Sequence, residues 1–234
     1  MDMLSGDEIT EARLADWRKL AQGLHARYAV ADFAAAARLV AAIATAVDTG
    51  DHLRATLGAG FVDLKLISQD AVYTDGEGTD HVVEWTTERD VELARRITDV
   101  AAEQGASPDV AGITSIELAL DTAHEDLVAP FWSALLTGGQ EAQGRGTISG
   151  DVRDLAGRVP YLWFQESDEH ETPRQRFHWD VFVPHEYAEQ RIAAALAAGG
   201  TVVSQENGFT ILADPDGNKA CVSLANPPAQ PADG

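Results

Sequence analysis

The feature that most constrains how this chain can fold is an internal repeat in its second half. Residues 117–139 align with residues 178–200 at a constant offset, which places His124 on His185 and one glycine pair on another. Each copy reads as a strand, a helix, the glycine pair and further short strands. A repeated unit of this kind buries its apolar face against a neighbouring copy. The second half is therefore predicted to fold as two βαβββ modules that pack together.

The first half shows helices and strands without a repeat. Asp32 is placed to cap a helix whose apolar residues recur at helical spacing as far as Val47, and Thr87 with Asp90 is placed to open another. The other predicted elements are a short helix from Ser5, a strand within 20–30, a strand at 61–68, a turn at 75–80 and a strand at 81–85.

Periodicity stops at residues 105–112, which predicts a linker, and a strand at 116–120 opens a new pattern. The chain has 234 residues, more than the ~100–150 of a typical single domain. We therefore predict two domains, residues 1–106 and 107–226, and a disordered tail at 227–234.

The charge balance limits the expected partners. Seventeen Lys and Arg stand against 38 Asp and Glu, a formal charge of −21 that is spread over both halves. Nucleic acids and anionic membranes both require a basic surface, so neither is expected as a partner. The chain starts without the features of a signal peptide, and no segment approaches the ~20 apolar residues of a membrane span. With a single cysteine, Cys221, an internal disulfide framework is excluded, and we expect a cytoplasmic protein.

Four features follow one another between residues 32 and 101. They are a helix that begins with phenylalanine, a polar turn at Asp51 and His52, an alternating strand with Gln69 near its end, and a Thr-x-x-Asp helix start that ends at Asp90. This order resembles the pterin-4a-carbinolamine dehydratase family over almost the whole first domain. The resemblance implies helices on an antiparallel sheet, and hence an α+β fold.

The resemblance also implies a catalytic site at Asp51, His52, Gln69 and Asp90. Aligned without gaps, the family's His-His-Pro turn begins at Asp51, its later strand histidine falls on Gln69, and its helix-start aspartate falls on Asp90. The family's lyase reaction removes the 4a-hydroxyl of a tetrahydropterin: one proton goes to the leaving oxygen and one is taken from a ring nitrogen. Histidines suit both steps, because their pKa lies near neutrality.

Two of the three family histidines are replaced in this chain. Asp51 is a carboxylate, and Gln69 is an amide that cannot exchange a proton, while the loss of one positioned acid or base typically costs ~10²–10⁴-fold in rate. We therefore expect weak dehydratase activity or none. In the alternative interpretation, Asp51 and His52 form only a polar turn and Gln69 ends a strand.

The second domain carries four motifs in a characteristic order. They are Ala129-Pro130-Phe131-Trp132, Trp163-Phe164-Gln165, Arg176-Phe177-His178-Trp179-Asp180 and Asp214-Pro215-Asp216-Gly217-Asn218. Residues 113–224 resemble the glyoxalase-like, vicinal-oxygen-chelate superfamily. The order of a dehydratase-like domain followed by a glyoxalase-like domain resembles a recurring bacterial fusion.

In that superfamily two modules curl into a cup-shaped sheet, with ligands on the first and last strands of each module. By position the resemblance assigns Glu117, Gln165, His178 and Cys221 to a common pocket. These side chains could hold a divalent metal, although a pocket without metal is the default because Gln165 and Cys221 depart from the family's ligand set. Trp132, Trp163 and Trp179 are candidates to line a site for a flat ligand, or else belong to the core.

Three functions remain open at this stage. The chain is a dehydratase-type hydro-lyase with an altered pterin pocket, a glyoxalase-superfamily enzyme acting on a small metabolite, or a ligand-binding or scaffold protein without catalysis. The expected ligand is a small molecule, a pterin or another metabolite. Exposed sheet edges and helix faces predict a homodimer or a larger homo-oligomer.

Overall fold

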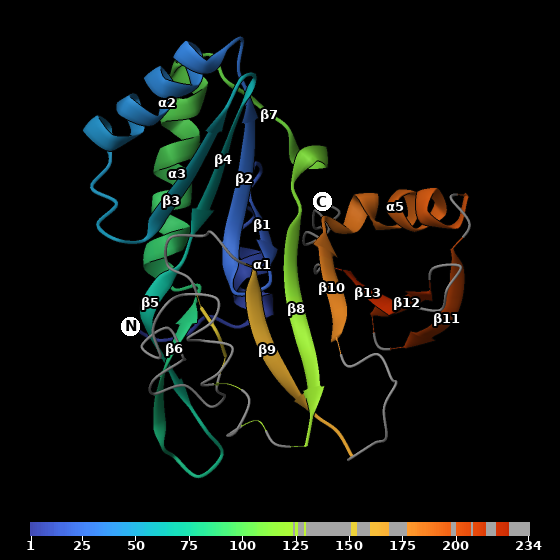
Figure 1. Cartoon of the computed structure of the whole chain (residues 1–234). Coiled ribbons are helices and arrows are strands. Elements are labelled where there is room, and N and C mark those ends of the chain that lie inside the picture. Colours follow the sequence, from blue (N-terminus) through green and yellow to red (C-terminus); the bar gives the residue numbers. More distant parts are fainter. Residues whose placement is uncertain are drawn as a thin grey trace, which may run out of the picture. The chain divides into compact units, whose positions relative to one another are not determined.

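The chain divides into two compact units in a computed structural model (Figure 1). The main body of one unit is Met1–Thr114, and the other comprises Ser115–Val183 and Tyr187–Leu224. The structure describes residues 1–123, 125, 129, 151–153, 160–168, 177–197, 200–206, 208–213 and 219–224. Both units combine helices with sheets that are mainly antiparallel, so the α+β class is confirmed.

The first unit contains three α-helices, a short 3-10 helix and seven strands. In chain order these are α1 (Gly6–Glu11), β1 (Arg18–Leu20), β2 (Gly23–Ala29), α2 (Phe33–Ala46), β3 (Leu53–Gly58), β4 (Phe61–Leu66), β5 (Ser68–Thr74), β6 (Asp80–Trp85), α3 (Glu88–Glu103), β7 (Ser107–Pro108) and η1 (Val110–Gly112).

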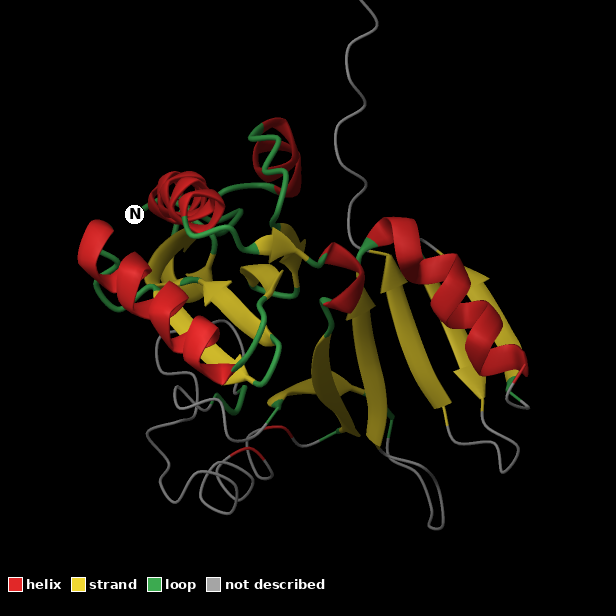
Figure 2. Ribbon diagram, turned by 90° about the horizontal axis from the view of Figure 1, so that it is seen from above, coloured by secondary structure: helices red, strands yellow, loops and turns green. Residues whose placement is uncertain are grey.

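The main sheet of this unit has the order β1-β2-β4-β3, with every pair antiparallel. Alternate residues of the central strands enter one core with α2 and α3, the two long helices at the left of Figure 2. The buried residues from these four elements are Leu24, Ala26, Tyr28, Val62, Leu64, Leu66, Ala36, Leu39, Ile43, Val91, Leu93, Ala94, Ile97, Val100 and Ala101. Burial of this apolar set, rather than helix propensity, holds the helices on the sheet.

The predicted helix starts are confirmed. Ser5 and Glu8 form a capping box at α1, and the Asp32 carboxylate accepts a hydrogen bond from the amide of Ala35 at α2. At α3 the Asp90 carboxylate accepts from the backbone amide of Thr87. Each bond satisfies an amide that the first helical turn leaves without a partner.

Between residues 61 and 85 the expected outline needs correction. The predicted strand at 61–68 is two strands, because β4 ends at Leu66 and Ser68 already begins β5. β5 and β6 form a separate antiparallel hairpin, with Val72 opposite Val82. The predicted turn at 75–80 is the tip of this hairpin, where the Asp75 carboxylate accepts from the backbone amides of residues 77 and 79.

Two further elements had no clear sequence signal. The edge strand β3 lacks a clean alternation of buried and exposed residues, which is the pattern that identifies a half-buried strand. The stretch expected as a linker contains β7, which pairs with β2 through Tyr28 and Pro108. A two-residue strand cannot show periodicity, so only the pairing partner defines it.

The second unit contains one described helix and six strands. They are β8 (Ser115–Thr122), β9 (Tyr161–Glu166), β10 (Phe177–Val183), α5 (His185–Ala197), β11 (Thr201–Glu206), β12 (Phe209–Ala213) and β13 (Lys219–Leu224). The strand order is β11-β12-β13-β10-β8-β9. From β10 to β13 the elements follow the predicted βαβββ order of the second module, and β8 and β9 are the described strands of the first.

The two modules join through an antiparallel pairing of β8 with β10. Glu117 lies opposite Asp180, and His178 lies opposite Ala119. In the sequence repeat, Glu117 corresponds to His178 and Ala119 corresponds to Asp180. Exchanging the two modules therefore converts the Glu117–Asp180 pair into the His178–Ala119 pair, and the reverse. The repeat therefore corresponds to an approximate twofold axis between these two strands.

The sheet of the second unit has an apolar face and a polar face. Val183, Leu212 and Val222 pack with Ala188 of α5, the helix at the right of Figure 2. Because neighbouring residues of a strand point to opposite faces, the residues between them point away from α5. That second face carries the candidate site described below. No helix in the described ranges combines the length and apolar character needed to cross a bilayer.

On the face of the first sheet that points away from its helices, one histidine predicts a pH dependence of stability. His25 lies opposite Lys65, and its Nε2 atom is buried without a hydrogen-bond partner. Burial, aided by the charges of Lys65 and Lys19, lowers the pKa of His25 from 6.5 to about 3. The unfolded chain therefore binds a proton below pH 6.5 that the folded chain does not bind until about pH 3.

We expect the free energy of unfolding to fall as the pH drops below 6.5, with His25 contributing up to about 2 kcal/mol of that loss between pH 7 and pH 5. His25→Gln removes this contribution, because glutamine does not titrate. Urea unfolding followed by circular dichroism at both pH values measures it. Equal pH slopes for the wild type and His25→Gln would show that the imidazole is not held neutral by the fold.

Candidate functional site

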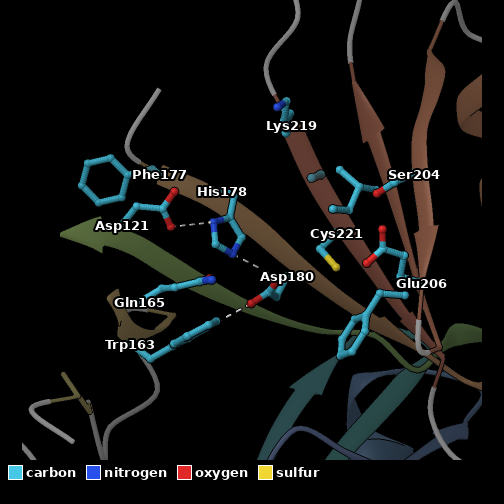
Figure 3. A pocket seen from close by; sticks show the side chains of 13 residues that line it. Asp121, Trp163, Gln165, Phe177, His178, Asp180, Ser204, Glu206, Lys219 and Cys221 are labelled. Carbon is cyan, nitrogen blue, oxygen red and sulfur yellow. Dashed lines mark hydrogen bonds and ion pairs between the residues drawn. The ribbon is translucent and has the colours of Figure 1, made fainter. Parts of the chain in front are cut away.

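The polar face of the second sheet encloses a cavity of about 720 Å³ (Figure 3). Strand alternation brings residues from all six strands of the sheet to it. The lining residues are Asp121, Trp163, Gln165, Phe177, His178, Asp180, Ser204, Glu206, Phe209, Ile211, Lys219, Ala220 and Cys221. The lining thus combines three carboxylates, a lysine and a histidine with three aromatic rings.

His178 lies between two of these carboxylates. Its Nδ1 atom is 3.3 Å from Oδ1 of Asp121, and its Nε2 atom is 3.6 Å from Oδ1 of Asp180. Both separations exceed the ~2.7–2.9 Å of a strong charge-assisted hydrogen bond. Asp121 Oδ1 is buried and accepts no hydrogen bond of good geometry. The imidazole is therefore oriented by its neighbours, while both carboxylates keep acceptor capacity.

The side chain of Trp163 reaches across the neighbouring strand β8 to Asp180, one of these two carboxylates. Its Nε1–H donates to Oδ2 of Asp180 over 3.0 Å, and its ring meets the imidazole of His178 edge-on with the ring centroids 6.0 Å apart. In the sheet Trp163 lies opposite Ala119, which in turn lies opposite His178. The small alanine between them leaves room for the indole to pass over β8.

Asp180 lies at the centre of these contacts and is buried. Burial raises the pKa of Asp180 above 3.8, and the nearby Asp121 adds to this, while His178 and the Trp163 hydrogen bond act in the opposite direction. Burial, together with the charge of Asp180, also raises the pKa of the Cys221 thiol to about 11. Cys221 is therefore a neutral thiol near pH 7, unsuited to act as a nucleophile.

Four of the predicted pocket residues line the cavity: Trp163, Gln165, His178 and Cys221. Glu117 points to the same face by strand alternation and is buried, but it is not part of the lining. Trp132 lies outside the described residues, and Trp179 is exposed and is not part of the lining.

Sequence reasoning missed two central residues, Asp121 and Asp180. Strand alternation from the predicted positions could have found both, because Asp180 follows His178 by two residues and Asp121 follows Glu117 by four. The strand pairing also shows which residues of the two modules occupy equivalent positions. Trp163 lies opposite Ala119 and Cys221 lies opposite Asp180, so Trp163 is the counterpart of Cys221 in the other module.

The lining does not fit a metal centre. Within the part of the chain that the structure describes, no three His, Cys, Asp or Glu side chains are arranged to hold a metal ion. Of the four candidate ligands, Glu117 does not line the cavity, and both nitrogens of His178 face carboxylates. A typical zinc centre needs three or four converging donors at ~2.0–2.3 Å, which this arrangement does not provide.

The first unit holds a second polar cluster, at the start of α3. Asp90 is fully buried, and its Oδ1 atom lies 2.9 Å from Nδ1 of His52. Its Oδ2 atom accepts from the hydroxyls of Ser68 and Thr87 at 2.8 and 3.1 Å. Because a carboxylate only accepts, the proton of His52 is assigned to Nδ1, which leaves Nε2 as the nitrogen that can exchange a proton.

The structure brings together two of the four predicted catalytic residues, His52 and Asp90. Gly50 has φ +52°, and the turn it forms places His52 directly before β3. Asp51 is exposed, and Gln69 lies in the irregular part of β5, between Ser68 and Ala71. Among the described contacts, no hydrogen bond or ion pair links Asp51 or Gln69 to His52. Ser68 and Thr87 belong to the cluster although sequence reasoning gave them no such role.

Residues 117–223 match the family model of a glyoxalase-like domain. The second unit therefore contains a glyoxalase-like domain, as its repeat and motifs predict. Among solved structures, the chain is similar to a transcriptional coactivator/pterin dehydratase from Brucella melitensis, with 23% sequence identity and a TM-score of 0.33. That similarity covers 43% of this chain and 99% of the other, and at this TM-score it carries no argument about the site. No curated protein matches the chain.

The Trp163–Asp180 hydrogen bond generates a prediction for nuclear magnetic resonance. Because the pKa of Asp180 is raised above 3.8, we expect the indole N–H signal of Trp163 to shift with pH around a midpoint above that value. Asp180→Asn retains an acceptor but does not titrate, so this transition disappears. Trp85, whose Nε1–H donates to the backbone oxygen of Leu4, is the internal control and keeps a constant signal. A transition that persists in Asp180→Asn would assign it to another group.

Proposed function

We propose that the glyoxalase-like unit binds a small organic molecule in its cavity and does so without a metal ion. The observation that carries the proposal is the composition of the lining, in which aromatic rings and converging polar groups share one concave face. Small-molecule sites in proteins typically have volumes of ~300–1,000 Å³ and combine apolar walls with a few oriented polar groups. The cavity, at about 720 Å³, falls within that range.

The internal contacts of the lining support recognition by preformed groups. Trp163 and His178 are held in place through Asp180 before any ligand enters, which lowers the entropy lost on binding. An aromatic ligand can stack on such rings with a gain of roughly 0.5–1.5 kcal/mol per pair beyond the burial of its surface.

The test uses a neutral aromatic probe, 2-phenylethanol, and two tryptophan substitutions in the same strand. Ser204→Trp fills the cavity, whereas Thr201→Trp adds the same side chain at an exposed position of β11 outside the lining. We expect the wild type and Thr201→Trp to bind the probe with a Kd on the order of 1 mM, and Ser204→Trp to bind at least about tenfold more weakly. Saturation-transfer NMR measures the three affinities. Equal binding by the wild type and Ser204→Trp would reject the cavity as the site.

A second candidate function is proton transfer at His52 in the first unit, of the pterin-carbinolamine dehydratase type. The observation that favours it is the buried Asp90, which orients the imidazole of His52. A carboxylate that fixes the orientation of a histidine is a common arrangement for general acid–base catalysis. Asp51 and Gln69 remain the weak points of this candidate, because neither is a histidine and neither contacts His52 in the described structure.

The dehydration of a 4a-hydroxytetrahydropterin tests this candidate. The wild type should be weak or inactive, and Asp51→His with Gln69→His should raise the rate by ~10²-fold or more, because positioned acid–base groups are restored. Asp51→His with Asp70→His is the matched control, since Asp70 is the exposed neighbour in the same strand. Equal rates for the two double variants would reject a pterin pocket at this place.

A further inference from the structure

We infer that the ligand of the glyoxalase-like cavity is an aromatic molecule with a positively charged group, such as a protonated amine. This inference rests on the proposed function, because it names the class of ligand for the same cavity. It follows from the placement of the carboxylates and the aromatic rings in the lining.

The charge of the lining favours a cation. Asp121, Asp180 and Glu206 supply three carboxylates, against the single lysine Lys219. The whole chain carries a formal charge of −21, so the surrounding field has the same sign. An anionic ligand would meet repulsion from both, whereas a cation would be attracted into the cavity.

The carboxylates are only partly satisfied by the protein. Asp121 Oδ1 is buried and accepts no well-formed hydrogen bond, and Nδ1 of His178 lies 3.3 Å from it. Asp180 Oδ1 lies 3.6 Å from His178 Nε2, and the Cys221 thiol is a further hydrogen-bond partner of the Asp180 carboxylate. An ionised carboxylate offers about four acceptor positions, so either side chain can accept a hydrogen bond from a ligand ammonium group.

The aromatic part of the ligand follows from Trp163. The indole faces the same cavity as the carboxylates, and its N–H donates to the negatively charged group of Asp180. Donation to an anion moves electron density onto the indole ring, which strengthens its attraction for a cation above the ring face. Phe177 and Phe209 extend the aromatic lining. One ligand with a ring and an ammonium group can therefore use both features.

The experiment compares three probes of nearly equal size on the full chain at pH 7: 2-phenylethylammonium, 2-phenylethanol and phenylacetate. We expect the cation to bind at least about tenfold more tightly than the alcohol, and phenylacetate to bind most weakly. Raising the salt concentration should weaken the binding of the cation and leave that of the alcohol nearly unchanged. Isothermal titration calorimetry, with displacement for the weak probes, gives the ratios.

Asp121→Asn tests the assignment to a residue, because it removes one charge and keeps the shape of the side chain. We expect the ratio of cation to alcohol affinity to fall at least about threefold in this variant. Asp168→Asn is the matched control: it removes the same charge from an exposed position after β9, outside the lining, and should keep the wild-type ratio. Equal losses in both variants would show a general effect of net charge and overturn the inference.

The outcomes separate the two proposals. If 2-phenylethanol binds and Ser204→Trp prevents it, while the cation binds no more tightly than the alcohol or the anion, the cavity is a binding site and the inference is wrong. If none of the three probes binds at 10 mM, on the order of the weakest fragment affinities, the proposed function fails and the inference fails with it.

Discussion

The antiparallel pairing of β8 with β10 is the constraint on which the second unit depends. It is the only contact between strands of the two modules in the described sheet, and it sets which residues meet at the centre of the polar face. With Glu117 opposite Asp180 and Ala119 opposite His178, two carboxylates, an imidazole and a small residue occupy adjacent places. A shift of this pairing by one residue would turn the residues of one of the two strands to the opposite face, the side on which apolar residues pack against α5.

The sequence predicted the elements that carry strong local signals. The helices after Ser5, Asp32 and Thr87 begin with side chains that satisfy free amides, and their apolar spacing matches the buried faces. The elements that escaped prediction carry no clear pattern of their own. β3 and β7 are defined as strands by their pairing with β4 and β2, which supply the hydrogen bonds, and β5 is set apart from β4 by its pairing with β6.

The site was predictable to the extent that the repeat fixes strand faces. His178, Gln165, Trp163 and Cys221 line the cavity because they occupy strands that the repeat and the motifs had located. The missed residues show that the position of a residue in the sequence does not reveal all of its side-chain contacts. The role of Asp180 comes from an indole that crosses β8 above Ala119, and the distance between Trp163 and Asp180 in the sequence contains no sign of that contact.

Two of the buried carboxylates, Asp90 and Asp180, differ in how far the protein satisfies them, and the difference separates a structural role from a binding role. Asp90 accepts from a backbone amide, two hydroxyls and His52, so donors of the protein occupy its acceptor positions. Asp180 accepts one hydrogen bond from Trp163, has the Cys221 thiol as a second partner and meets His178 only at 3.6 Å. Burial of a charge is costly unless donors surround it. Asp90 meets this cost within the fold and therefore orients His52, whereas Asp180 retains positions that a ligand donor can fill.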